Sequence, residues 1–130
     1  MPSVQLTPRG IAAAIFGMAL ALRLVLLAET SESPYAQTLL LDAAEYQHLA
    51  RGLLEGTWSD AAEQTYVHGI LYPVMWAAIE ACGGGVTTLL LLQAILGAAT
   101  CVLIFAAARH LLAPAAAILC GILAGVYWPL

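Results

Sequence analysis

Residues 87–108 read TTLLLLQAILGAATCVLIFAAA, and this stretch decides the fold class. It contains no charged side chain, and Gln93 is its only amide. At about 1.5 Å of rise per residue, a helix over this stretch is roughly 33 Å long, which matches the hydrocarbon thickness of a bilayer, about 30 Å. The stretch therefore predicts a helix that crosses a membrane.

Three further apolar runs accompany this segment. Residues 10–28 are apolar apart from Arg23 and predict a first span. Residues 70–82 are short for a crossing unless their flanks lie in the membrane interface. Pro114 opens a last run that is still apolar at Leu130. The expected fold is all-α, a polytopic transmembrane helical bundle with about four spans. We expect these spans over 10–28, 69–82, 87–108 and 114–130, with an external loop over 29–68.

The composition supports a lipid environment. Hydrophobic residues make up 62% of the 130 residues, charged residues 9%, and the mean hydropathy is +0.90. Polar side chains are therefore too few to cover a water-facing surface. The arginines are scattered and form no basic stripe, which argues against a nucleic-acid partner. Cys82, Cys101 and Cys120 lie in or beside apolar runs, where helix packing suits them better than a disulfide or a metal site.

The first apolar run, residues 10–28, has the apolar character of a signal peptide as well as of an anchor. No small-residue cleavage site follows this run, so we interpret it as a retained anchor and the protein as a multi-pass protein of the inner, or plasma, membrane. Arg9 precedes the run, which places the amino terminus in the cytoplasm and the loop over 29–68 outside. With four crossings, Arg109 and His110 would also fall outside, against the same tendency, unless the short run over 70–82 is re-entrant.

Small residues recur every four positions in three of the predicted spans. Such stripes let helix backbones approach closely in lipid, and tight bundle packing explains them better than a cofactor groove. The stripes are Ala13, Gly17 and Ala21 in the first span, Gly97 and Cys101 in the third, and Ala117, Gly121 and Gly125 in the last.

One segment of the external loop has the periodicity of an amphipathic helix. Its apolar positions follow the i, i+3, i+4, i+7, i+8 pattern of one helical face, and Gly56 ends it. Asp42 and Glu45 have the spacing of a capping box at its start. We expect this helix to lie on the membrane with its apolar face in the interface. The apolar positions are Tyr46, Leu49, Ala50, Leu53 and Leu54.

Asp42 has two interpretations, which are compatible with each other. As an N-cap, its side chain stabilises the helix by on the order of 1 kcal/mol. As a functional group, it is a carboxylate at the membrane surface that takes a proton from an acceptor hydroxyl or holds a metal ion beside a phosphate.

These residues carry a resemblance to a known family. Asp42, Tyr46, Ala50, Leu53, Leu54 and Gly56 resemble the "D…Y…A..L..G" signature in the first loop of the GT-C membrane glycosyltransferases, which include protein O-mannosyltransferases and the aminoarabinose transferase of lipid A. The sequence from His68 to Pro73, HGILYP, is similar to the segment that leads into the second span of that family. Many relatives have a proline before Leu-Tyr-Pro, whereas this chain has Gly69 and Ile70.

The resemblance implies an inverting transfer of a sugar from a polyprenyl phosphate to an acceptor on the external face. Asp42 would be the catalytic base. Stabilising the departing phosphate needs a cation, for which Arg23, Arg51 and His68 are candidates, whereas Glu45 and Tyr46 would shape the site. The residues expected to bind substrate are His68, Tyr72, Arg23, Glu45 and Tyr46. The resemblance assigns no metal ligand and leaves open whether a divalent metal takes part.

Two of the candidate cations also have structural interpretations. Arg23 lies near the outer end of the first span, where snorkelling to the interface is the default and phosphate contact the alternative. His68 is either a neutral interfacial histidine or a group that faces a phosphate or a metal.

The last residues of the sequence bear on the expected partners, and two rival functions remain open. Tyr127 to Leu130 give no polar flank, so we expect an amino-terminal fragment that is inactive without the remaining spans of the same enzyme. The expected partners are thus a lipid-linked sugar donor, membrane lipid and those spans. The main rival is a small helical assembly or scaffold protein, which the small-residue stripes would serve equally well. A transporter piece is less favoured, because ionisable residues or broken helices near the bilayer midplane are not evident.

Overall fold

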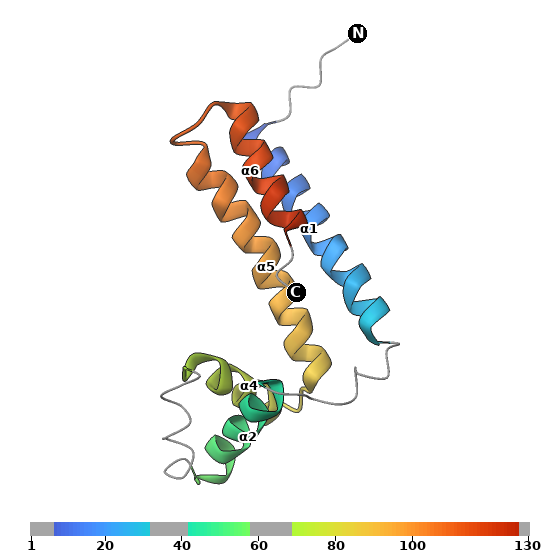
Figure 1. The fold of residues 1–130 in the computed structure, drawn as a ribbon, viewed down its shortest axis with the longest axis vertical. Coiled ribbons are helices and arrows are strands. Elements are labelled where there is room, and N and C mark those ends of the chain that lie inside the picture. The colour runs from blue at the N-terminus through green and yellow to red at the C-terminus, as the bar shows by residue number, and fades with distance from the viewer. Residues whose placement is uncertain (1–6, 32–41, 58–68, 128–130) are drawn as a thin grey trace. The chain divides into compact units, whose positions relative to one another are not determined.

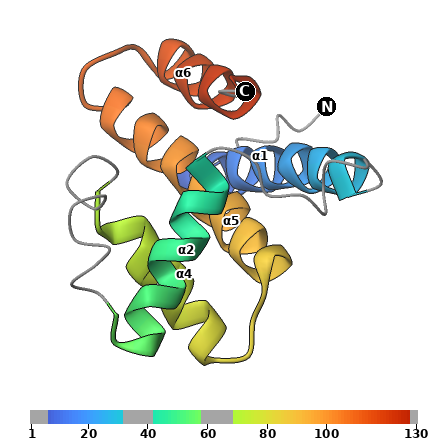
Figure 2. The same cartoon turned by 60° about the horizontal axis from the view of Figure 1, so that its bottom comes forward.

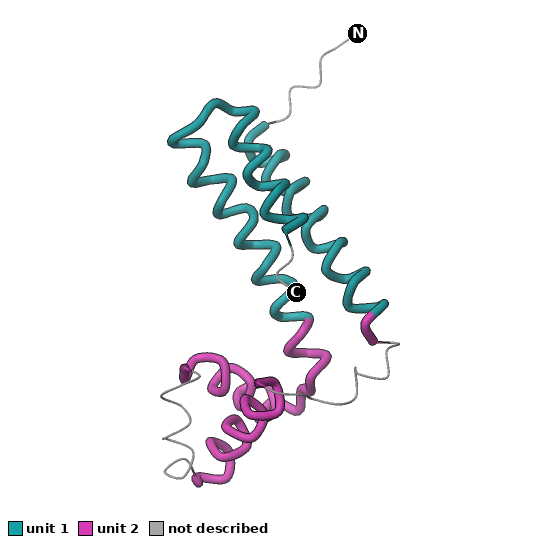
Figure 3. Tube along the Cα trace, viewed as in Figure 1, with its two compact units in different colours: residues 1–29, 91–130 teal, residues 30–90 magenta. Residues whose placement is uncertain are grey.

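A computed structural model of the chain describes residues 7–31, 42–57 and 69–127. Within these residues every regular element is an α-helix, which confirms the all-α class (Figure 1). The chain divides into two compact units, unit 1 with Met1–Glu29 and Leu91–Leu130, and unit 2 with Thr30–Leu90 (Figure 3). The helices are α1 (Pro8–Ser31), α2 (Asp42–Glu55), α4 (Leu71–Ala81), α5 (Val86–Ala108) and α6 (Pro114–Val126).

Two of these helices are long and apolar enough to cross a membrane. α1 has 24 residues and α5 has 23, and only 17% and 28% of their most apolar windows are buried. A core helix of a water-soluble protein would be mostly covered by its neighbours. α6 is apolar but has 13 residues, and α4 has 11. The two longest predicted spans are therefore present as helices of crossing length, and a total of four crossings stays a prediction.

In unit 1, α1 and α5 pack side by side in opposite directions (Figure 1). Arg23, late in α1, contacts Gly97, early in α5. Ile15, earlier in α1, lies at the level of Phe105, later in α5, because a Cβ built on Gly121 would meet both. Residues later in α1 therefore lie level with residues earlier in α5, so the two helices are antiparallel. The buried residues between these helices and α6 are Ile15, Ala19, Ala98, Cys101, Phe105, Ala108 and Ala117.

α6 packs on the same two helices and runs in the direction of α1. Gly121 faces Ile15, and Gly125 faces Met18 and Ala19, so both helices advance together. A Cβ on Gly121 would lie 2.8 Å from Ile15 Cδ1, and one on Gly125 would lie 3.0 Å from Met18 Cε. The absence of a side chain thus permits the close approach at Gly121, whereas at Gly125 a small shift of the flexible Met18 side chain would accommodate a Cβ.

The predicted packing stripes have different outcomes. Gly97 and Cys101 pack against Arg23, and the stripe of Ala117, Gly121 and Gly125 is buried, as expected. The stripe of Ala13, Gly17 and Ala21 is exposed, and nothing lies within 4 Å of a Cβ on Gly17. Packing of this stripe against a neighbouring helix stays a prediction, because within unit 1 α1 contacts its neighbours through the face of Ile15, Ala19 and Arg23.

In unit 2, α2 packs on α4 (Figure 2). Leu49, Ala50 and Gly52 of α2 are buried. Ala50 belongs to a cluster that also includes Trp76 and Ala77 of α4. The apolar face of α2 was expected to enter the membrane interface. In the structure α4 covers much of this face, and contact of α2 with the interface stays a prediction.

Glycines with a left-handed backbone delimit both helices of unit 2. Gly56 (φ 74°) ends α2 as predicted, and Gly69 (φ 74°) precedes α4. At the end of α4, Gly83 (φ 79°) donates its N–H to the Glu80 carbonyl and Gly84 donates to the Ile79 carbonyl, both at 2.9 Å. This is a Schellman motif, which stops a helix by satisfying its last carbonyls. α4 is therefore a short helix with defined ends.

Candidate functional site

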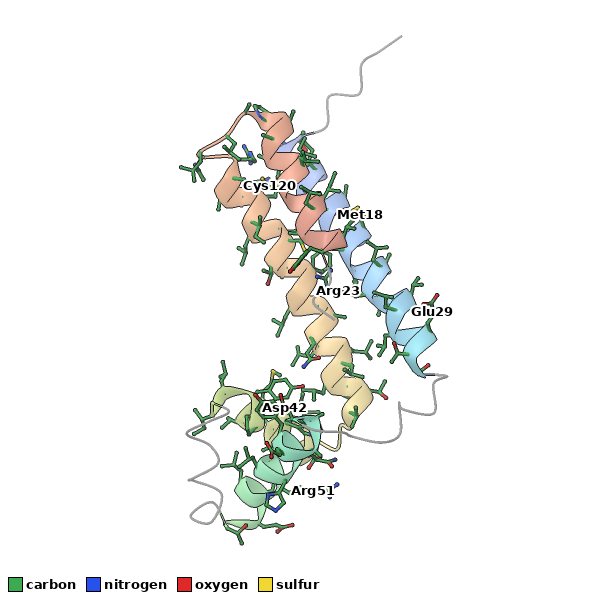
Figure 4. The ribbon with its side chains drawn as sticks, viewed as in Figure 1. Met18, Arg23, Glu29, Asp42, Arg51 and Cys120 are labelled. Carbon is green, nitrogen blue, oxygen red and sulfur yellow. The ribbon has the colours of Figure 1, made fainter. Side chains whose placement is uncertain are left out.

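Asp42 is the first residue of α2, and its side chain is exposed (Figure 4). The helix begins at this residue, within one position of the start that the capping-box pattern predicted. Its unsatisfied N–H groups carry partial positive charge, which stabilises a carboxylate in the first turn. Glu45, also exposed, adds a second carboxylate to the same turn. The start of α2 is therefore an accessible, acidic position on a helix that is packed against its neighbour.

An aromatic cluster lies one turn further along. Tyr46 follows Asp42 by four residues, so the two side chains share a face of α2. The Tyr46 and Tyr72 rings meet edge to face, with centroids 4.8 Å apart and an interplanar angle of 65°. The Tyr72 and Trp76 centroids are 6.0 Å apart at 89°. The structure thus brings together three of the predicted site residues, Asp42 and Tyr46 on α2 and Tyr72 on α4, at one corner of unit 2.

The back of this cluster is fixed by a hydrogen bond that the sequence analysis did not single out. Trp76 is 2% exposed, and its Nε1–H donates to Glu80 Oε1 at 3.0 Å. Tyr46 and Tyr72 are half-buried. The spacing of Trp76 and Glu80, four residues apart on one helix, was the signal that could have revealed the pair. The aromatic cluster is therefore fixed at its buried side and lies next to the exposed Asp42 carboxylate.

This arrangement suits two chemical tasks. An exposed carboxylate can accept a proton from a hydroxyl that comes within hydrogen-bond distance. Half-exposed tyrosine rings offer an apolar surface with a polar hydroxyl at one end, and such rings bind ligands that are themselves partly apolar and partly hydroxylated, as sugars are. Tyr46 and Tyr72 can therefore hold a ligand close to Asp42.

Arg23 belongs to unit 1, and its position differs from the one expected (Figure 4). Its side chain is only 8% exposed. Nη1 donates to the Ala19 carbonyl at 2.9 Å, and Nη2 approaches Cys101 Sγ at 3.9 Å. The guanidinium therefore points back toward the middle of α1. Snorkelling to the outer interface was the default expectation, and it was wrong because Gly97 leaves space for the guanidinium on α5.

Arg51, another predicted residue of unit 2, does not lie at this corner. His68 lies outside the described residues. Arg51 is exposed on α2, nine residues after Asp42, toward the other end of the helix. Among the residues that the structure describes, no group of three or more His, Cys, Asp or Glu side chains is arranged to hold a metal ion.

Comparison of the chain with models of known families, with curated proteins and with solved structures finds no match. The assignment of a function therefore depends on the residues of the chain and on their arrangement.

Proposed function

We propose that this protein is a membrane glycosyltransferase that transfers a sugar from a polyprenyl-phosphate donor to an acceptor at the external face of the membrane. The observation that carries the proposal is the exposed Asp42 carboxylate at the start of α2, one turn from the paired rings of Tyr46 and Tyr72. The "D…Y…A..L..G" pattern of the sequence, to which Asp42 and Tyr46 belong, supports the same class.

In this proposal Asp42 is the general base. Its carboxylate takes the proton of the acceptor hydroxyl, the hydroxyl oxygen forms a bond to the anomeric carbon, and the bond from that carbon to the phosphate oxygen breaks. The sugar configuration is inverted, and the polyprenyl phosphate leaves with the bonding electrons. General-base catalysis of this kind contributes roughly 10²- to 10⁴-fold to the rate. Tyr46 and Tyr72 would hold the sugar while Glu45 shapes the entrance.

The departing phosphate needs a positive charge nearby, which lowers the energy of the transition state. Arg51 and His68 remain candidates on the unit that carries Asp42. Arg23 belongs to unit 1, where its guanidinium donates to the Ala19 carbonyl. A divalent metal is an alternative source of that charge.

A polyprenyl donor also requires a protein at the membrane, since its hydrocarbon chain partitions into lipid. We propose that α1 and α5 cross the bilayer and that the protein is a multi-pass protein of the inner or plasma membrane. The length of both helices and the small buried share of their surfaces support this.

The decisive experiment compares Asp42→Asn with Glu55→Gln in the full-length protein. Asparagine has nearly the size and shape of aspartate and is equally well accepted at the start of a helix, so this change removes the base with little effect on α2. Glu55→Gln removes the same charge from the other end of α2, where Glu55 is exposed. Transfer of labelled mannose or aminoarabinose from its polyprenyl phosphate would be measured in isolated membranes.

We expect transfer by Asp42→Asn to fall by about 10²-fold or more, and by Glu55→Gln to change less than about twofold. Equal activity in the two variants would exclude Asp42 as the base. Absence of transfer by the wild-type protein from both donors would remove the support for a glycosyltransferase of this class.

A second candidate function is a helical assembly or scaffold protein. The exposed stripe of Ala13, Gly17 and Ala21 favours it, because nothing in unit 1 covers Gly17 and small residues are common where membrane helices meet. Such a protein would tolerate Asp42→Asn without loss of function and would lose its association on Gly17→Leu.

A further inference from the structure

The structure bears on how the chain crosses the membrane, a question that the sequence left open and that does not depend on glycosyl transfer. We infer that α4 does not cross the bilayer, so that α1 and α5 are consecutive crossings in opposite directions. The helices α2 and α4 then lie on the outer side of the membrane, and Arg9, Arg109 and His110 lie in the cytoplasm.

The first argument is the length of α4. A helix of 11 residues is about 16 Å long, roughly half of the hydrocarbon thickness. The helix cannot be lengthened within the described chain, because Gly69 and Gly83 both have left-handed backbones and the Schellman motif closes its last turn. A side chain at either glycine would be strained in that conformation. α4 is therefore too short for a comfortable crossing.

The second argument is the direction of α5. If α4 crossed, the chain would cross outward in α1, inward in α4 and outward again in α5. α1 and α5 would then be parallel. In unit 1 they are antiparallel, because Arg23 meets Gly97 whereas Ile15 lies level with Phe105. Antiparallel crossings require that the chain between them begins and ends on the same side of the membrane.

The third argument is the charge at the two ends of unit 1. Arg9 is the second residue of α1, and Arg109 and His110 directly follow α5, so the antiparallel packing places these three at one end. The Arg109 guanidinium lies 5.7 Å from the centre of the Phe105 ring, which keeps its charge at that end. Arginines in short flanks are retained in the cytoplasm. The conflict that four crossings created between Arg9 and Arg109 therefore disappears.

The fourth argument is the outer face of α4. Leu71 (80% exposed), Val74 (43%), Ala78 and Ala81 are exposed and follow one face of the helix. Tyr72, Trp76 and Glu80 are turned toward the other side. Only Cys82 to Gly85 separate α4 from α5, so this apolar face begins within a few residues of the membrane. Lipid is the occupant that fits an uncharged face of this kind.

The test uses single thiols and a membrane-impermeant maleimide on spheroplasts. Cys101→Ala and Cys120→Ala leave the native, exposed Cys82 as the reporter between α4 and α5. With Cys82→Ser added, His110→Cys reports the far end of α5, and Thr57→Cys reports the exposed end of α2. Labelling is compared before and after permeabilisation, which shows that each thiol is reactive.

We expect Cys82 and Thr57→Cys to be labelled fully in spheroplasts and His110→Cys only after permeabilisation. Protection of Cys82 with labelling of both Thr57→Cys and His110→Cys would show that α4 crosses, and labelling of Cys82 and His110→Cys from one side would show that α5 does not cross. Protection of Thr57→Cys would reverse the assigned sides. Alkaline phosphatase fused after Gly84 should be active and fused after His110 inactive, and this pair needs no cysteine replacement.

Discussion

Arg23 shows how one side chain sets the spacing of two helices. A guanidinium buried against an apolar helix is costly to desolvate, and a hydrogen bond to the Ala19 carbonyl offsets part of that cost. The group also needs space, and Gly97 provides it. A Cβ at Gly97 would lie 2.6 Å from Arg23 Nε, well inside contact distance. The pair of Arg23 and Gly97 is therefore a specific element of the α1–α5 interface.

Gly97→Ala should destabilise unit 1 by roughly 1–3 kcal/mol, because the new methyl group displaces the guanidinium from its position. Gly17→Ala is the matched control, since a Cβ there meets nothing within 4 Å. That control should be neutral or stabilising by up to about 1 kcal/mol, the helix propensity gained. Thermal unfolding in detergent measures both changes. Equal effects of the two substitutions would show that Arg23 is not seated on Gly97.

At the scale of elements, α2 depends on α4 for its place. Its hydrophobic face alone would allow either attachment to lipid or packing on another helix. In the structure this face packs on α4. Leu49 and Ala50 are fully buried, and the cluster that contains Ala50, Trp76 and Leu89 holds the pair together. The site at the start of α2 is thus positioned by packing several residues away from Asp42.

Ala50→Leu should loosen α2 from α4, because three added carbons have no room at a position that is 0% exposed. We expect a cost of about 1–3 kcal/mol. Arg51→Leu places the same side chain on the exposed neighbour and should cost less than about 0.5 kcal/mol. Hydrogen exchange of the α2 amides measures the difference, which should appear as faster exchange in Ala50→Leu only. If both variants exchange alike, α2 does not depend on this packing.

At the scale of the whole molecule, the exposed surface of the long helices is apolar. Leu96 lies at the middle of α5 and is 51% exposed. In lipid an exposed leucine at such a position is common, because apolar side chains there need no polar cover. In water, a continuous surface of exposed apolar side chains is unfavourable. The surface of α5 is therefore the feature on which the membrane proposal can be tested most directly.

Leu96→Arg should reduce insertion, since an arginine at the centre of a crossing helix costs about 2.5–3.5 kcal/mol. Leu111→Arg is the control, because Leu111 is 84% exposed and lies in the turn after α5. The share of protein that stays in the membrane after alkaline carbonate extraction should fall for Leu96→Arg and remain at the wild-type level for Leu111→Arg. Unchanged retention of Leu96→Arg, or extraction of the wild type, would contradict a crossing by α5.

Several features could be predicted from the sequence because their causes are local. α5 follows from an uninterrupted apolar run, and α2 begins at Asp42 and ends at Gly56 because capping and left-handed glycine act over a few residues. Asp42 and Tyr46 could be assigned to one face by helical spacing alone. Their pairing with Tyr72 of α4 rested on a resemblance until the ring contact was seen.

What the sequence by itself determined is the helical class, the apolar character and the starts and ends of most helices, since each depends on neighbouring residues and on their hydrophobicity. The tertiary structure decided which faces are covered: Ala19 and Arg23 inside unit 1, Gly17 outside, and Ala50 against Trp76. It also decided that α5 runs against α1. Hydrophobicity gives a helix an apolar face but does not specify which helix packs on it. Only the fit of side chains into the spaces left by glycines such as Gly97 and Gly121 selects one helix direction and one register.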